Sequence, residues 1–370
     1  MSEENLGNFF LIYNSILFFS GLFFASQSSS LLRFYSIEDD RLALYKTTLS
    51  QVFLPISFVL ILCGFLLILN IVPILALISI LFGIGTGLIL ILYTQLRVSG
   101  RFRDYFLVAI IQAIFVVAVM LIYSAETNVT NIITILFLSQ LCALVFILIK
   151  RYLSLRNIFL TNRNKYLSID LLMYGMPFML IAVSNTFISA YCQYILKYQN
   201  LDNDVGVYAL NYSIGEKIIF IFFSIIVTYK VPEIYQESQR SIKNAIYLIN
   251  GAVMMFLFYA LFIFIVSYFT SYYLSETFST VYIAERGHWI ILFSIISASF
   301  LGVFSLYNEI LLSLKKSGVV ALNYILLALI GALIGYFMIL NYGILGAAIA
   351  PILANIIGLI LLWMQIKRFV

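Results

Sequence analysis

Charge is scarce in this chain, and that scarcity decides its broad class. Only 10% of the 370 residues are Asp, Glu, Lys or Arg, whereas 63% are hydrophobic. The mean hydropathy is +1.07. A soluble protein carries roughly 25% charged and 45–50% apolar residues. The composition therefore excludes an ordinary soluble domain.

Residues that build metal, disulfide and nucleotide sites are also few. The three cysteines, Cys63, Cys142 and Cys192, lie inside apolar runs and are interpreted as small hydrophobic side chains. A single histidine does not make a metal site. The glycines of FGIGTGLIL follow no strand, so we expect neither a Walker-type phosphate loop nor ATP hydrolysis. No cofactor is expected.

What the chain does have is long apolar runs, each sufficient to cross a hydrocarbon core of about 30 Å as a helix. A β-barrel would need short alternating segments instead. The sequence predicts an all-α integral membrane protein with about 11 transmembrane helices. The expected spans are residues 6–26, 47–69, 74–95, 106–123, 131–149, 171–196, 205–229, 244–270, 287–308, 319–340 and 343–366.

Basic residues separate the loops into two sets. Of the 21 Lys and Arg, 18 lie in one set of alternate loops, Lys197 and Arg286 lie in the other, and Lys217 lies inside a span. The positive-inside rule then places the C-terminus in the cytoplasm. The start, MSEENLGNFF, lacks a basic segment and a cleavage site, so we expect no signal peptide. Eleven spans put the N-terminus outside, which suggests a helix missing before it.

An internal repeat supports the same count. LGNFFLIYNSI aligns with VGVYALNYSIG at an offset of 199, which pairs Gly7 with Gly206 and Tyr13 with Tyr212. Spans one to five then match spans seven to eleven, and the sixth is unmatched. We expect two pseudo-symmetric bundles with parallel topology. These are residues 1–165, with five helices and the first one missing, and residues 166–370, with six.

Several motifs carry a resemblance to a known family. They are Tyr174-Gly175-x-Pro177, Tyr194-Ile195-Leu196, Val205-Gly206-x-Tyr208, Tyr212, and Pro232 followed by Ile234-Tyr235. The chain resembles the polysaccharide-transporter family of Wzx-type flippases, in the superfamily that includes the multidrug and toxin extruders (MATE). The resemblance implies a MATE-like fold. Many members have Asp-Arg where this chain has Cys192-Gln193, so a polar pair is lost.

The resemblance implies a flippase and no enzyme activity. Its substrate would be an undecaprenyl-diphosphate-linked oligosaccharide, moved across the bacterial inner membrane for O-antigen, capsule or another surface polysaccharide. Implied partners are membrane lipid, a coupling ion (H⁺ or Na⁺), a polysaccharide polymerase and chain-length proteins. No nucleic acid is expected, because the net charge of +5 comes from short loops.

The seventh span holds an adjacent charged pair, Glu216 and Lys217, about 18 Å from its outer end. A charge near the bilayer midplane is costly and should face protein or water. At 100° per residue, the polar residues Tyr208, Tyr212, Ser213, Lys217, Ser224 and Thr228 share an arc of about 200°, opposite Ile221 and Ile225. By the resemblance, Lys217 would attract the diphosphate, and Glu216 would position Lys217 or take a coupling proton. The alternative is a structural interhelical pair.

Further charged residues mark the two ends of the spans. Arg33 lies at the cytoplasmic mouth of the first span, as a diphosphate gate or a topology anchor. Lys197, Arg286 and His288 would line the outer mouth or act as interfacial anchors. Glu309, near Lys315 and Lys316, is expected to be solvated.

Small residues and proline inside the spans predict how helices pack. Gly83-x-x-x-Gly87 and Gly331-x-x-x-Gly335 predict close helix contacts. Pro55, Pro177 and Pro351 would hinge alternating access or bend their helices.

Two other functions compete with a flippase. A small-molecule cation antiporter of the extruder branch would need an acidic cavity, and Glu216 is the clear intramembrane acid. A membrane polymerase or ligase would need a large outer loop with catalytic residues. The longest outer loop, 271–286, offers only Glu276, Glu285 and Arg286.

Overall fold

The structure is a computed structural model of the whole chain. It describes residues 3–35, 43–51, 56–57, 74–99, 101–122, 132, 134–142, 145, 165–277 and 287–367. These residues form helices and turns, without a strand among them. The labelled helices are α1 (Glu3–Phe34), α3 (Ile74–Val98), α4 (Phe102–Ile122), α6 (Lys165–Tyr198), α7 (Asp202–Arg240), α8 (Ile242–Thr277), α9 (Gly287–Ser313) and α10 (Ser317–Ile366).

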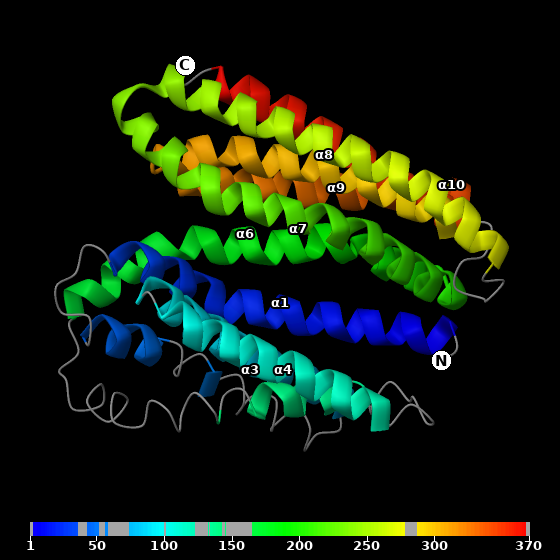
Figure 1. The fold of residues 1–370 in the computed structure, drawn as a ribbon, viewed down its shortest axis with the longest axis horizontal. Coiled ribbons are helices and arrows are strands. Elements are labelled where there is room, and N and C mark those ends of the chain that lie inside the picture. Colours follow the sequence, from blue (N-terminus) through cyan, green and yellow to red (C-terminus); the bar gives the residue numbers. More distant parts are fainter. Residues whose placement is uncertain are drawn as a thin grey trace. The chain divides into compact units, whose positions relative to one another are not determined.

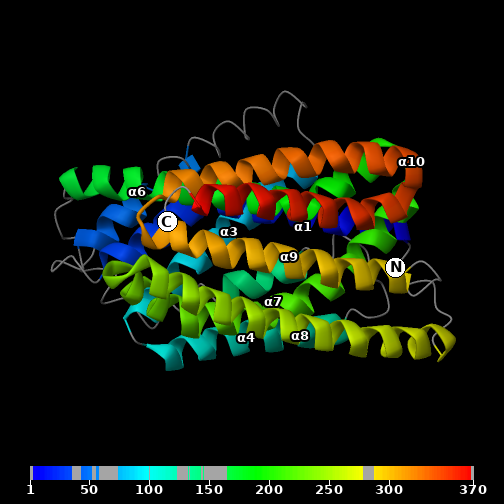
Figure 2. The same ribbon diagram turned by 90° about the horizontal axis from the view of Figure 1, so that it is seen from above.

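Six of these helices are long and apolar enough to cross a membrane, which confirms the predicted class. They are α1, α6, α7, α8, α9 and α10. The longest, α10, contains two spans, because Gly343 leaves the helical conformation (φ 56°, ψ −134°). Figure 2 shows the chain reversing there, from orange to red. The predicted spans 319–340 and 343–366 are its two arms. Span 47–69 lies largely outside the described residues, and span 131–149 lies partly outside them.

The chain divides into two compact units. The N-terminal unit is Met1 with Leu11–Thr186, and the C-terminal unit is Ser2–Phe10 with Phe187–Val370. Both α1 and α6 therefore contribute to each unit. The predicted division into residues 1–165 and 166–370 stays a prediction.

Small residues bring the helices of the C-terminal unit close together. α7, α8, α9 and α10 run along a common direction, with α9 in contact with the other three (Figure 1). A methyl group added to Gly215 of α7 would lie 2.7 Å from the carbonyl oxygen of Ile291 in α9. Gly302 of α9 likewise faces the ring of Phe256 in α8. Only glycine permits such backbone approach.

Both predicted glycine motifs lie at close helix contacts, as expected. In the C-terminal unit, Gly331 and Gly335 of α10 pack against the buried ring of Tyr191 in α6. In the N-terminal unit, Gly83 and Gly87 of α3 pack against α1, with Gly87 under the ring of Phe24. The pairs are four residues apart, so both members lie on one helix face.

The two glycines that the repeat pairs are in contact. A methyl group on Gly7 would lie 3.1 Å from the backbone nitrogen of Gly206, and both residues belong to the C-terminal unit. The relation of the two halves by a parallel repeat stays a prediction.

Candidate functional site

Two helices of the C-terminal unit expose faces of different chemistry. On α8 the exposed stripe is wholly apolar at its centre, with Met254, Phe258 and Phe262 between 60% and 78% exposed. On α7 the exposed stripe is mixed, because Lys217, Ser224 and Thr228 alternate with Ile214, Ile221 and Ile225. An apolar stripe suits acyl chains, whereas a mixed one suits water or a polar ligand.

Lys217 lies at the middle of α7. It is 13 residues from Asp204 and 13 from Lys230 in the sequence, or about 20 Å from each along the helix. Its side chain is exposed, and within the described part of the chain it has no hydrogen-bond or ion-pair partner. The neighbouring Glu216 is half-buried and is not ion-paired with it there. The pair is therefore not a closed salt bridge.

Tyr212 lies on a different side of α7 from Lys217. It is 6% exposed, and its hydroxyl shares a 3.0 Å hydrogen bond with Ser297 of α9. Asn355 of α10 donates to the Ser297 hydroxyl at 3.1 Å and to its carbonyl at 2.9 Å. These three residues join three helices.

The predicted polar arc of α7 therefore divides into two faces, which corrects the helical-wheel interpretation. Tyr208 and Tyr212 pack inward, while Ile221 and Ile225 share the exposed stripe of Lys217. An arc of about 200° is wider than one helix face, and part of it packs against α9. Ser213 donates to the Leu210 carbonyl at 2.9 Å. The assignment of these residues to a substrate cavity stays a prediction.

Sequence reasoning missed the polar residues buried in the C-terminal unit. Besides Ser297 and Asn355, Asn323 of α10 donates to Asn308 of α9 at 3.1 Å, and both amides are buried. The available signal was an amide side chain inside an apolar run, since such residues seek partners on other helices.

Arg33 belongs to the N-terminal unit, where it contacts α6. Its guanidinium lies 4.3 Å from the centre of the Tyr174 ring, which is a favourable cation–π position. The next residue, Gly175, faces the Ser26 carbonyl, and Ser30 donates to the Leu171 carbonyl at 2.8 Å. The Tyr-Gly-x-Pro motif thus packs α6 against α1. The role of Arg33 as a gate stays a prediction.

The residues predicted at the outer mouth have separate surroundings. Lys197 forms an ion pair with Asp202 across the α6–α7 turn, at 2.5 Å, with both side chains about 40% exposed. His288 lies beside Trp289 at the start of α9, with ring centres 4.7 Å apart. Arg286 lies outside the described residues.

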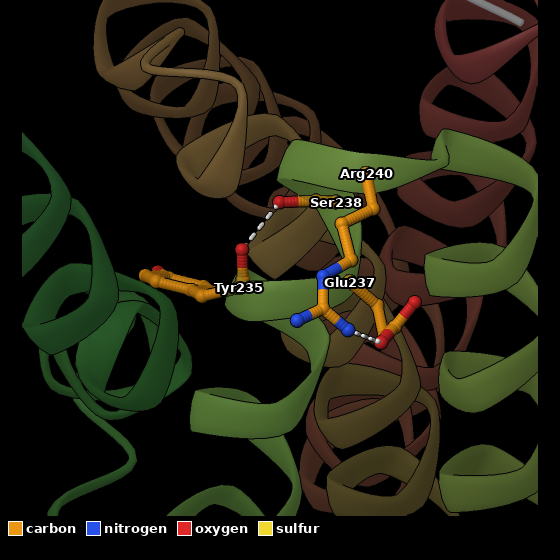
Figure 3. Close-up of polar contacts among 4 residues, drawn as sticks. All are labelled: Tyr235, Glu237, Ser238 and Arg240. Atoms are coloured by element: carbon orange, nitrogen blue, oxygen red, sulfur yellow. Dashed lines mark hydrogen bonds and ion pairs between the residues drawn. The ribbon is translucent and has the colours of Figure 1, made fainter.

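Glu309 is placed differently from the solvated position expected for it. It is partly buried and accepts a 2.7 Å hydrogen bond from the hydroxyl of Tyr235 in α7. Figure 3 shows Tyr235 near the end of α7, one turn before Ser238, whose hydroxyl donates to the Tyr235 carbonyl at 2.9 Å. The lysines near Glu309 in sequence suggested solvent, but the side chain points to α7.

The described part of the chain contains no candidate metal site. No group of three or more His, Cys, Asp or Glu side chains there could hold a metal ion.

Three solved structures of membrane transport proteins have a fold similar to that of this chain. No protein-family model matches the chain, and no curated protein sequence matches it significantly. An inward-facing MATE multidrug transporter of the MOP superfamily has a TM-score of 0.67 at 15% identity, covering 99% of this chain and 91% of its own. The lipid II flippase MurJ, in an inward closed conformation, has a TM-score of 0.67 at 16% identity. The match covers 99% of this chain and 80% of MurJ. A structure of MATE in complex with MaL6 has a TM-score of 0.70 at 13% identity. The match covers 99% of this chain and 88% of that one. The chain therefore has the all-helical fold of MATE transporters and of MurJ.

Proposed function

We propose that this chain is a flippase that moves an undecaprenyl-diphosphate-linked oligosaccharide across the bacterial inner membrane, for surface polysaccharide synthesis. The observation that carries the proposal is Lys217, exposed and in no ion pair within the described structure, at the middle of an apolar helix. The fold is shared with a structure described as a lipid II flippase. The predicted cytoplasmic C-terminus belongs to the same proposal.

The cost of a charge in hydrocarbon supports a polar surrounding for Lys217. A lysine at a helix centre costs about 3 kcal/mol on insertion scales, so a side chain there faces water, protein or an anion. A diphosphate is an anion that a compact ammonium attracts at short range. The lipid tail of such a substrate can stay in the bilayer, so only its headgroup needs the polar face.

Two hydroxyls extend the polar character of this face away from Lys217. Ser224 and Thr228 follow on the same exposed stripe, the second about 16 Å along the helix from Lys217. Their hydrogens bond to local carbonyls of α7, at 2.7 and 2.8 Å. Their oxygens retain lone pairs that can accept from sugar hydroxyls. The stripe therefore offers a cation for the diphosphate and acceptors for the sugar.

A small-molecule cation antiporter is the second candidate, because MATE multidrug transporters share the fold. Glu216 would supply the acidic group. The adjacent ammonium of Lys217 disfavours it, since an exposed cation repels a cationic substrate.

Transport of the lipid-linked oligosaccharide tests the proposal. Cells that lack their own flippase receive the wild-type chain, Lys217→Gln, Lys217→Arg, or the matched control Lys230→Gln. We expect surface polysaccharide from wild type, Lys217→Arg and Lys230→Gln, and a loss of at least about tenfold from Lys217→Gln at equal membrane levels, the effect of about 1.4 kcal/mol.

Two results would count against this function. Normal polysaccharide from Lys217→Gln would contradict the role of the lysine. Extrusion of a cationic dye by the wild-type chain, without any surface polysaccharide, would favour the antiporter.

A further inference from the structure

A groove on the C-terminal unit lies apart from the Lys217 stripe. It is formed by α8, α9 and α10 and has a volume of about 560 Å³, within the range of about 300–1,000 Å³ typical of small-molecule sites. Its walls are mainly aliphatic. They include Ile246 of α8, Ile310 of α9 and Leu359 of α10. Such a wall suits a fatty-acyl chain.

The groove also has polar groups on α8 and α9, and an exposed tryptophan beside a lysine at the end of α10. Asn250 of α8 accepts a 2.8 Å hydrogen bond from the hydroxyl of Tyr307 in α9. Trp363 of α10 is 57% exposed, and the ammonium of Lys367 lies 3.6 Å from the centre of its ring. Tryptophan and lysine with this arrangement are typical of the level of lipid headgroups.

The helix ends at one end of the groove carry four lysines. Ile246 lies one turn inside the start of α8, Ile310 one turn before the end of α9, and Ile366 is the last residue of α10. The chain segments at these helix ends carry Lys243, Lys315, Lys316 and Lys367. One end of an apolar groove therefore has several positive charges.

Two acids of the described residues near this end of the groove have contacts with residues of α7. Glu237 is ion-paired with Arg240 at 3.3 Å, within the last turns of α7 (Figure 3). Glu309 accepts from Tyr235. Both acids are therefore held by partners on or facing α7, and α8 has no acidic residue in its first turn.

The geometry points to a binding site for an anionic phospholipid of the surrounding bilayer, with one acyl chain in the groove and the phosphate among Lys243, Lys367 and their neighbours. Basic pockets between transmembrane helices bind anionic headgroups in this way. The charge at the groove's end favours such a lipid over a zwitterionic one. This site is independent of the transported substrate.

The two tryptophans of the chain make the site directly measurable. Trp363 lines the groove, whereas Trp289 lies at the start of α9. In Trp289→Phe, Trp363 is the sole tryptophan, and in Trp363→Phe the sole tryptophan is Trp289. Each full-length variant is reconstituted in phosphatidylcholine bilayers with increasing brominated phosphatidylglycerol or brominated phosphatidylcholine, and quenching is measured.

The expected result is a lipid preference at one tryptophan. We expect half-maximal quenching of Trp363 at a mole fraction of phosphatidylglycerol about fivefold or more below that of phosphatidylcholine, since each lysine contributes about this factor. Trp289 should show no preference. Adding Lys243→Gln and Lys367→Gln to the Trp289→Phe background should abolish the preference, and Lys230→Gln should retain it.

Three outcomes overturn the proposal. They are equal quenching of Trp363 by the two lipids, a preference that survives removal of both groove lysines, and no quenching by either lipid. The last would mean that a second copy of the chain covers the groove.

Discussion

Replacing Gly215 with alanine should destabilise the packing of α7 against α9. The new methyl group would lie almost on the hydroxyl of Ser294 and 2.7 Å from the Ile291 carbonyl oxygen. The serine can rotate, but the carbonyl belongs to the backbone of α9. Overpacking of this kind costs about 1–3 kcal/mol. We expect Gly215→Ala to be the less stable chain by that amount.

A matched glycine isolates the packing effect from the change in helix propensity. Gly251 of α8 has nothing within 4 Å of an added methyl group, so Gly251→Ala should gain up to about 1 kcal/mol from propensity alone. The comparison is made by thermal unfolding in detergent. A midpoint several degrees lower for Gly215→Ala than for Gly251→Ala is the expected result.

A double substitution then tests whether the added methyl group at residue 215 clashes with the Ser294 hydroxyl or with the Ile291 carbonyl. Ser294→Ala removes the hydroxyl but leaves the Ile291 carbonyl in place, so it should rescue Gly215→Ala only in part. Equal midpoints for Gly215→Ala and Gly251→Ala would refute the close contact between α7 and α9. Full rescue by Ser294→Ala would refute the role given to the backbone.

Three further substitutions test other parts of the C-terminal unit by the same unfolding measurement. Ser297→Ala leaves the buried Tyr212 hydroxyl of α7 without its bond, while Asn355 of α10 keeps only its bond to the carbonyl of residue 297. A loss of about 1–2 kcal/mol is therefore expected; an unchanged midpoint would contradict that three-helix contact. Tyr235→Phe removes the donor to Glu309 and should cost about 1 kcal/mol, unless Glu309 is solvated, in which case nothing changes. Gly343→Ala strains the turn of α10 at φ 56° and should cost about 1–3 kcal/mol, whereas Gly318→Ala, in open space, should be neutral or stabilising.

Hydropathy predicts the spans well because the bilayer itself fixes how long an apolar run must be. The runs at 205–229 and 244–270 are the centres of α7 and α8, which extend to Arg240 and Thr277. The extensions were not predicted, since polar residues continue a helix beyond the hydrocarbon without leaving an apolar signal.

The surroundings of individual polar residues were harder to predict. A helical wheel gives the angle of Tyr212 but cannot say which side packs against α9, and its burial depends on Ser297, 85 residues later. Glu309 was misjudged for a similar reason. Lysines follow it in sequence, yet its partner Tyr235 is 74 residues earlier. Partners remote in sequence leave no mark in local periodicity.

Lys217 was found from the sequence because a lone charge inside an apolar run stands out without knowledge of any partner. Lys217 is exposed on α7, and the expectation that it faces protein or water stays a prediction. What the sequence could not supply was the mixed composition of its stripe.

The most direct test of the account asks what solvent surrounds residue 217. In a chain whose three native cysteines are replaced by alanine, Lys217→Cys and the control Phe258→Cys are each exposed to a charged, membrane-impermeant thiol reagent. Phe258 lies in the apolar stripe of α8 and is 78% exposed. A thiol reacts as its thiolate, which forms only in a polar surrounding. We expect the cysteine at position 217 to react and a diphosphate lipid to slow that reaction. We expect the cysteine at position 258 not to react. Reaction of both variants only with a lipid-soluble maleimide would contradict it.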